Sequence, residues 1–416
     1  MFRRNRTPEI SRERLIETTL HLVSYDTSNP PGDTRKIVDW IESVLMDLGL
    51  ETDRVATDPA KPNLLSTLPG ERSTTLLYSG HLDTVPYDPD GWTYDPLGER
   101  VDNRLYGRGT TDMKGGVATM LELARIYVES DRRPPVTLAF AFVSDEEVAG
   151  DAGLHAVLDA DRLTADACII GEPTGPLNAP SITVADKGSL WLTLESTGEA
   201  AHGSRPMLGT NAIDALWDAL ETIRERLADY PITVPAEVEP IMEESIAYYG
   251  ASINEDTARR LFDQPTVNLG TIEGGEAVNS VPRFARAELD IRLPAGVDTE
   301  AVLADIREWL HEDEAISITD ASSSVGTYEA PESPLVAAAM TAATTALGGR
   351  IYRRSATGGG DAKRLRNAGI PTVEFAIGTD TVHACDEYTT VDALEATAEV
   401  YARLPNAFAR HESRIS

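Results

Sequence analysis

Four uninterrupted apolar runs separated by helical segments constrain the fold of this 416-residue chain more than any other feature. The runs are TLLYSG (75–80), VTLAFAFV (136–143), ACIIG (167–171) and PTVEFAI (371–377). Continuous apolar strands that alternate with helices are typical of a mostly parallel sheet with helices on both faces. The pattern therefore predicts an α/β fold, with helices at 9–23, 33–48, 115–129, 151–159, 333–347 and 391–409.

The middle of the chain has a different pattern. GSLWLTLESTGEA (188–200) and RFARAELDIRLP (283–294) alternate apolar and polar residues in the manner of half-exposed strands. With helices expected at 210–227 and 299–312, the pattern favours an antiparallel sheet with helices on one face. We predict an inserted α+β domain at 188–322 within a discontinuous first domain formed by 1–187 and 323–416. Residues 228–265 are expected to form an extra helical excursion within the insert.

Composition excludes several classes of protein. A net charge of −31 argues against nucleic acid as a partner, because phosphate would be repelled. The acidic residues are spread along the chain and lysine is rare, which leads to the hypothesis of a halophilic source. No apolar run is long enough to cross a membrane, and the arginine-containing N-terminus lacks the apolar region of a signal peptide. Because Cys168 and Cys385 suggest no disulfide framework, we expect a cytoplasmic protein.

Acidic residues and histidines follow the apolar runs. They are His81 and Asp83 after the first run, Asp145, Glu146 and Glu147 after the second, Glu172 after the third, His383 after the last, and Asp112 just ahead of the helix at 115–129. The carboxyl ends of parallel strands meet at one edge of a sheet, which is where ligands bind in open α/β folds. Two histidines and several carboxylates at one edge predict a metal site.

The expected donor set also narrows the metal. Imidazole and carboxylate without thiolate suit Zn²⁺, with Co²⁺ or Mn²⁺ as alternatives. Two histidines and three carboxylates are too many for one tetrahedral ion. They are enough for two ions about 3.5–4 Å apart if one carboxylate bridges them.

Six motifs together resemble the M20 metallopeptidase family. They are GHLDTVP (80–86), GRGTTDMKGG (107–116), SDEEVAG (144–150), GEPTG (171–175), AHGSRP (201–206) and the late His383-Ala384 pair. The resemblance spans nearly the whole chain in the right order. That family includes acetylornithine deacetylases, succinyl-diaminopimelate desuccinylases, aminoacylases and glutamate carboxypeptidases.

The resemblance implies a role for each candidate ligand. His81, Asp112 and Glu172 would hold one metal ion, whereas Asp112, Glu147 and His383 would hold the other, with Asp112 as the bridge. Asp83 would accept the second ring N–H of His81, because ligating imidazoles usually need a partner that fixes their orientation. An ordinary turn acid is the alternative for Asp83.

Glu146 is the candidate general base. Adjacent residues in an extended chain point in opposite directions, so Glu147 can bind metal while Glu146 faces a water molecule between the ions. Glu146 would take the proton of that water and return it to the leaving amine. Asp145 is expected to be a loop or capping acid.

The resemblance also suggests residues that contact the substrate. His202 would donate a hydrogen bond to the developing oxyanion, often from the partner subunit, and Asn279 and Arg292 would hold a substrate carboxylate. A structural histidine and an exposed strand cation are the alternatives for His202 and Arg292. The glycine-rich TGGGDAKR (357–364), which includes Gly359, lacks the Gly-Lys-Ser/Thr sequence of a P-loop, and no strand is expected to lead directly into it. By resemblance it forms a backbone wall of the substrate pocket, although Gly360 stands where many family members have threonine or serine.

We therefore predict a two-domain amidohydrolase with two divalent metal ions that removes an acyl group from an N-acyl amino acid. An aminoacylase, metallocarboxypeptidase or dipeptidase of the same family is the alternative. A non-catalytic binding protein on the same fold is an alternative of a different class, and the absence of a G-x-S-x-G motif argues against a serine hydrolase. The resemblance further implies a homodimer formed through the inserted domain, which would serve for dimerisation or as a lid.

Overall fold

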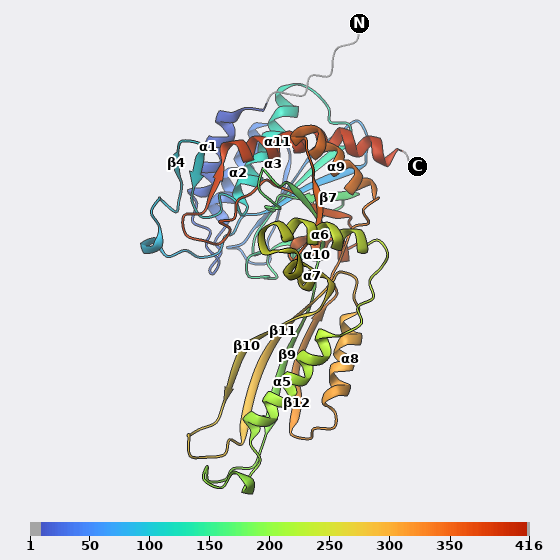
Figure 1. Ribbon diagram of the computed structural model, residues 1–416. Helices are drawn as coiled ribbons and strands as arrows, with labels where there is room; N and C mark the ends of the chain where they lie inside the picture. The colour runs from blue at the N-terminus through green and yellow to red at the C-terminus, as the bar shows by residue number, and fades with distance from the viewer. Residues whose placement is uncertain (1–9, 414–416) are drawn as a thin grey trace. The chain divides into compact units, whose positions relative to one another are not determined.

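The computed structural model describes residues 10–413, which divide into two compact units (Figure 1). Unit 1 takes in the chain up to Val184, together with Glu329–Arg353 and the chain from Gly360 onwards. Unit 2 consists of Ala185–Tyr328 and Arg354–Gly359.

An eight-stranded sheet has the order β1-β2-β6-β3-β7-β14-β8-β13. Its strands are β1 (Thr52–Val55), β2 (Asn63–Leu68), β3 (Thr75–His81), β6 (Thr137–Val143), β7 (Ala167–Ile170), β8 (Ser181–Asp186), β13 (Tyr352–Ala356) and β14 (Thr372–Glu374). The four strands predicted from apolar runs are its parallel centre, since β3 pairs in parallel with β6 and β7, and β14 pairs in parallel with β7. Consecutive residues of β6 and β7 are buried, so both faces of the sheet are covered.

All six helices predicted for the first domain are present. Unit 1 contains α1 (Arg12–Val23), α2 (Arg35–Asp47), α3 (Lys114–Glu129), α4 (Leu154–Asp159), α9 (Pro334–Leu347), α10 (Asp361–Asn367) and α11 (Val391–Glu412). Helix α1 begins at Arg12 because the Ser11 side chain caps it, and residue 9 of the predicted helix lies outside the described residues. The short helix α10 was not predicted.

Smaller elements complete unit 1. A three-stranded sheet has the order β15-β5-β4, formed by β4 (Glu99–Val101), β5 (Arg104–Tyr106) and β15 (Tyr388–Thr390). A 3₁₀ turn, η1 (Pro89–Gly91), precedes it in the chain. Sheet β15-β5-β4 brings the chain after His383 next to the chain before Asp112.

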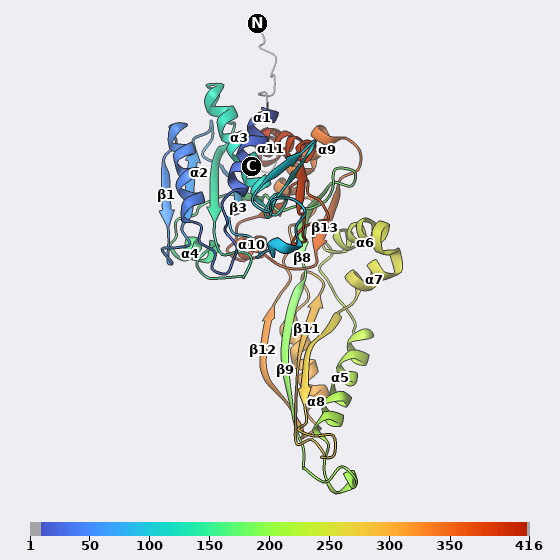
Figure 2. The same ribbon diagram turned by 90° about the vertical axis from the view of Figure 1, so that its left-hand side faces the viewer.

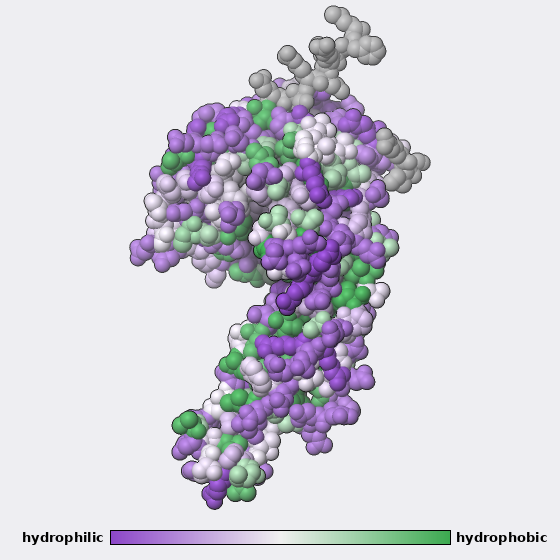
Figure 3. All heavy atoms as spheres, in the orientation of Figure 1, coloured by the Kyte–Doolittle hydropathy of each residue, from purple (hydrophilic) through white to green (hydrophobic). Residues whose placement is uncertain are grey.

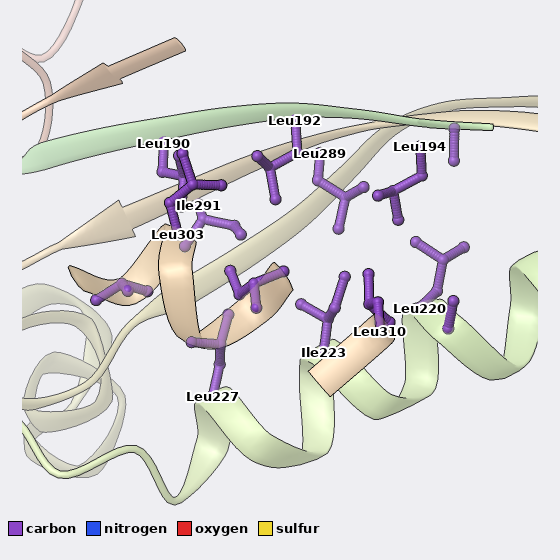
Figure 4. Close-up of a cluster of buried hydrophobic side chains, with 14 of the residues drawn as sticks. Leu190, Leu192, Leu194, Leu220, Ile223, Leu227, Leu289, Ile291, Leu303 and Leu310 are labelled. Atoms are coloured by element: carbon purple, nitrogen blue, oxygen red, sulfur yellow. The ribbon is translucent and has the colours of Figure 1, made fainter. Parts of the chain in front are cut away.

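Unit 2 is an antiparallel sheet of order β10-β11-β9-β12 with helices on one face (Figure 2). Its elements are β9 (Gly188–Thr197), η2 (Pro206–Leu208), α5 (Ala212–Ala228), α6 (Glu239–Ile253), α7 (Glu255–Asp263), β10 (Thr266–Gly274), β11 (Phe284–Leu293), α8 (Thr299–Leu310) and β12 (Ile316–Ser324). Alternate residues of β11 are buried, as the sequence pattern predicts. Figure 4 shows leucines and isoleucines of β9 and β11 packed against apolar residues of α5 and α8.

These units show the predicted fold class: a mostly parallel α/β sheet with helices and a separate antiparallel sheet with its own helices. The borders of unit 2 fall a few residues outside 188–322, because Asp186 hydrogen-bonds to both the backbone and the side chain of Thr327. The predicted helical excursion forms α6 and α7, whose own core contains Ile246, Ala258 and Phe262.

Hydrophilic residues predominate on the face of the molecule seen in Figure 3, as expected for a chain with many charged residues. Within residues 10–413, no helix combines the length and the apolar character that crossing a membrane requires.

Candidate metal centre

The predicted ligands of unit 1 lie at the carboxyl edge of the parallel strands. His81 ends β3, Glu147 follows β6, and Glu172 follows β7. His383 lies between β14 and β15, and Asp112 lies two residues before α3. Five segments that are far apart in the sequence therefore supply one site, because parallel strands end at the same edge.

Asp112 lies at the middle of this site. Its Oδ1 is 3.1 Å from Nε2 of His81, and the same nitrogen is 3.3 Å from Oε1 of Glu172. Its Oδ2 is 3.1 Å from Nε2 of His383, which is also 3.1 Å from Oε2 of Glu147. Each oxygen of Asp112 thus faces a different pair, each made of one histidine and one glutamate. This is the arrangement that a bridging carboxylate requires.

Backbone contacts determine which nitrogen of His81 can act as a ligand. Nδ1 lies 2.9 Å from the backbone carbonyl oxygen of Asp83, which can only accept a hydrogen bond. Nδ1 therefore carries a proton, and Nε2 is the atom left to bind a cation. The predicted acceptor, the Asp83 carboxylate, is 3.8 Å from Nδ1 and makes other hydrogen bonds. The orienting group is accordingly the main chain of Asp83, which follows the strand closely enough to reach the ring.

The Asp83 carboxylate instead holds the loop after β6. It accepts hydrogen bonds from the backbone N–H groups of Glu146 at 3.1 Å and Glu147 at 3.2 Å. Asn29 donates to both Asp83 and Asp145 at 2.9 Å. The buried carboxylates are therefore satisfied by hydrogen bonds, as burial of charge requires.

Asp145 lies in a loop, as expected, but it is buried as part of this network. Lys61 forms an ion pair with it, and the backbone N–H of Ala152 donates to its Oδ2 at 3.2 Å. Burial alone would raise the pKa of Asp145, but hydrogen bonds from Lys61 and Asn29 bring it below the usual value. Asp145 has φ of 63°, a backbone conformation that needs support from its surroundings.

Glu146 lies against Gly360. A Cβ atom at Gly360 would come 2.7 Å from Oε1 of Glu146, so the glycine leaves the space that the carboxylate occupies. Burial raises the pKa of Glu146 to about 8. A carboxylate oxygen of Glu146 also lies within 4.8 Å of donor atoms of His81 and Glu172, which puts it beside the site.

The electrostatics of the site fit a cation. Burial and the Asp112 carboxylate raise the pKa of Glu172 well above its usual range. Hydrogen bonds to Asp112 and Glu147 raise the pKa of His383 to about 10. Burial alone would lower the pKa of His81, but its carboxylate neighbours raise it. Carboxylates crowded in a buried site favour positive charge, and the grouped donors among the described residues are imidazoles and carboxylates, which suit divalent metal ions.

Comparison with known proteins agrees with this geometry. Residues 77–407 match the profile of peptidase family M20/M25/M40. The chain belongs to this family. A succinyl-diaminopimelate desuccinylase of Rhodospirillum centenum is 32% identical over 401 residues, which cover 92% of this chain and 95% of the relative. An acetylornithine deacetylase of Vibrio campbellii is 31% identical over 311 residues, covering 73% and 72% of the two chains.

A solved M20 structure shows the same fold. The M20 family metallo-carboxypeptidase Sso-CP2 of Sulfolobus solfataricus superposes with a TM-score of 0.77 over 95% of this chain and 99% of that one, at 19% identity. Family membership makes this chain a metal-dependent hydrolase that acts on amide bonds. The alternative prediction of a non-catalytic binding protein is therefore rejected.

In unit 2, His202 and Asn279 lie close to each other. His202 and Ser280 form an antiparallel bridge, and the backbone N–H of Gly203 donates to the carbonyl oxygen of Asn279 at 2.7 Å. The backbone N–H of Ser204 donates to Nδ1 of His202 at 3.2 Å. Nδ1 is therefore an acceptor, so a neutral His202 carries its proton on Nε2 and can donate it.

Arg292 lies at the other end of β11 and is already paired. Nε of Arg292 is 2.7 Å from Oδ1 of Asp290, and Nη2 of Arg292 is 3.0 Å from Oδ2 of Asp290. Asn279 precedes β11, and the strand from Phe284 to Arg292 spans about 27 Å at ~3.3–3.4 Å per residue. One copy of unit 2 therefore does not bring all three predicted substrate contacts together.

Gly359 is exposed and belongs to the segment Arg354–Gly359 of unit 2. Gly360, the next residue, is the one that packs against Glu146 in unit 1. Of these two glycines, Gly360 is therefore the one that leaves space for the Glu146 carboxylate.

Several residues that support the centre were not predicted. They are the buried Asn29, Arg108 and Glu387 and the partly buried Lys61, together with Asp145 in its buried role. Lys61 could have been singled out in the sequence, because lysine is rare in this chain, which has only five. Glu387 carried no signal, since acidic residues are common throughout.

Proposed function

We propose that this M20 hydrolase removes the acyl group from an N-acyl amino acid, in the manner of acetylornithine deacetylases and succinyl-diaminopimelate desuccinylases. The observation that carries the proposal is the position of Asp112, whose two oxygens face two different histidine–glutamate pairs. The two curated relatives, named desuccinylase and deacetylase, support this choice of substrate class.

The donor atoms fit two divalent cations, for which Zn²⁺ is our first choice and Co²⁺ or Mn²⁺ the alternatives. His81, Asp112 and Glu172 would hold one, and Asp112, Glu147 and His383 the other. When bound, such cations polarise an amide carbonyl and make a water molecule more acidic.

Glu146 would transfer the proton. Its carboxylate takes a proton from the attacking water and delivers it to the nitrogen of the leaving amine. Nearby cations would lower its pKa from about 8 and favour the ionised form at neutral pH. Asp83 holds the backbone of Glu146 and Glu147, so these two side chains keep separate tasks.

The contacts in unit 2 support a homodimer. The Nε2–H of His202 is suited to donate to the oxyanion that forms when water attacks the amide. Because His202 and Asn279 lie far from Arg292 along one sheet, a second copy would be needed for one substrate to meet all three. Arg292 would then exchange Asp290 for the substrate carboxylate.

A substrate screen tests the proposal. N-acetyl and N-succinyl amino acids should be hydrolysed with added zinc, cobalt or manganese at high salt, and a chelator should abolish the activity. Dipeptides serve as the competing class: faster hydrolysis of dipeptides would favour the metallocarboxypeptidase or dipeptidase alternative.

Glu146→Gln tests the division between base and ligand. Turnover should fall by about 10²–10⁴-fold while the metal content stays unchanged, because a general base contributes that much. Loss of a metal ion in this variant would show that Glu146 and Glu147 have exchanged roles.

A further inference from the structure

A buried ion pair joins two of the loops that supply the metal centre. Arg108 is 5% exposed, and the side chain of Glu387 is fully buried against it. The two residues are far apart in the chain, and neither is among the groups that face the site. Their pairing within the core of unit 1 therefore needs an explanation of its own.

Glu387 holds the backbone that leads to Asp112. Its Oε1 accepts hydrogen bonds from the backbone N–H groups of Gly109 at 3.1 Å, Thr111 at 3.0 Å and Asp112 at 3.2 Å. These donors belong to a loop rather than to a helix or a sheet, so they need another acceptor. One carboxylate oxygen thus shapes the turn that presents Asp112.

Arg108 holds the backbone of His383. Its Nη2 donates to the carbonyl oxygen of His383 at 3.2 Å, while Nη1 contacts Glu387. His383 has φ of 61°, in the left-handed region that a non-glycine residue adopts only when its surroundings fix it. The Arg108 guanidinium also lies 5.4 Å from the ring centre of Trp92, which limits its movement.

We propose that Arg108 and Glu387 are positioning residues that align Asp112 with His383 for the cation held by Asp112, Glu147 and His383. The proposal rests on the two-cation site of the proposed function. Within residues 10–413, the pair hydrogen-bonds to the backbone of Asp112 and of His383 but to neither His81 nor Glu172. Breaking the pair should therefore weaken one cation more than the other.

Zinc titration of the full-length chain, followed by calorimetry and elemental analysis after removal of bound metal, tests this inference. The wild type should bind two zinc ions. Arg108→Met and Glu387→Gln should bind the ion held by Asp112, Glu147 and His383 about 10–100-fold more weakly, the usual effect of losing a group that supports a ligand. The other ion shares only Asp112 with these two loops, so its affinity should fall by a smaller factor. Glu387→Gln keeps an acceptor oxygen, so it carries the test if Arg108→Met does not fold.

Arg14→Met and Glu122→Gln are matched controls. Arg14 and Glu122 form an ion pair at 2.9 Å between α1 and α3, in which the Glu122 side chain is 1% exposed and the Arg14 side chain 34%. These variants should lower thermal stability but still bind two zinc ions. Circular dichroism confirms that each variant is folded.

The outcomes separate the two proposals. Unchanged affinity for both ions in folded Arg108→Met and Glu387→Gln would overturn the positioning role, as would equal weakening of both ions. If the wild type itself bound fewer than two ions, the two-cation site would be wrong, and the positioning role would fall with it.

Discussion

The two units of this chain present their predicted site residues in different ways. In unit 1, five predicted ligands from five segments come within hydrogen-bonding distance of a partner ligand. In unit 2, His202 and Asn279 are exposed, and Arg292 lies at the far end of β11. The metal centre can form within one copy of unit 1, whereas the predicted substrate contacts of unit 2 cannot meet within one copy.

The predicted site residues of the two units also differ in how firmly their surroundings hold them. Buried or partly buried partners hold the loops of unit 1, including Asn29, Lys61, Arg108 and Glu387. Among the described residues, the ring of His202 is hydrogen-bonded only to Ser204, its neighbour two positions along the chain. A site that binds metal needs fixed donors, whereas a group that meets a changing substrate can remain accessible.

Asp112→Asn should have the largest effect, because Asp112 serves both histidine–glutamate pairs. We expect both cations to be lost and turnover to fall to the limit of detection. His383→Ala, the matched variant, should lose only one cation. Elemental analysis of the purified proteins distinguishes the two results, and an Asp112→Asn protein that kept two ions would contradict the bridging role.

His202→Ala should lower turnover by about 10²–10³-fold, the usual effect of removing a donor to the oxyanion. Metal content should not change. The partner question is settled by mixing His202→Ala with Glu146→Gln, two nearly inactive proteins. If His202 acts in the partner's site, mixed dimers restore roughly a quarter of wild-type activity, because half of randomly assorted dimers are mixed and each has one intact site. No recovery after verified subunit exchange would place His202 in its own subunit's site.

Lys61→Met should destabilise the fold by about 1–3 kcal/mol, because Asp145 loses its cation but keeps the hydrogen bonds from Asn29 and the backbone of Ala152. The pKa of Asp145 lies below its ordinary value in the folded state, so the stabilisation is present above about pH 4 and is lost as pH falls further. The difference in unfolding free energy between wild type and Lys61→Met should therefore be largest at neutral pH and shrink near pH 3. Urea titrations at several pH values provide the measurement, and a difference that did not depend on pH would refute the ion pair.

Salt should have the smallest and most diffuse effect. Since the net charge is −31, raising ionic strength screens self-repulsion and should stabilise the chain. Three of the five tryptophans, Trp191, Trp217 and Trp309, lie in unit 2, where acidic residues outnumber basic ones roughly two and a half to one. The melting temperature, followed by tryptophan fluorescence, should rise steadily with salt concentration. Maximal stability below ~0.5 M salt would argue against the halophilic hypothesis.

Much of the fold could be predicted because its signal is local. Apolar runs such as VTLAFAFV indicate buried strands, and alternation in β11 indicates a half-exposed one. The exact ends depend on contacts that the pattern lacks: Ser11 caps α1, and the strand predicted at 371–377 is confined to Thr372–Glu374.

The site was predictable where a residue type is rare in its position, as with His81 at the end of β3 and His383 in the loop before β15. Its support was not, because long-range pairing decides which acids are buried. Asp145 and Glu387 resemble dozens of other acids in this chain until Lys61 and Arg108 are brought beside them. The acceptor for His81 was also missed, since a backbone carbonyl has no signature in the sequence.

Gly360 gives the side chain of Glu146 room to move. A Cβ atom at this position would come 2.7 Å from Oε1 of Glu146, which is the far end of a flexible side chain. A small rotation of the glutamate would therefore accommodate a larger residue at 360. The glycine thus leaves this carboxylate a freedom that threonine or serine at the same position would reduce.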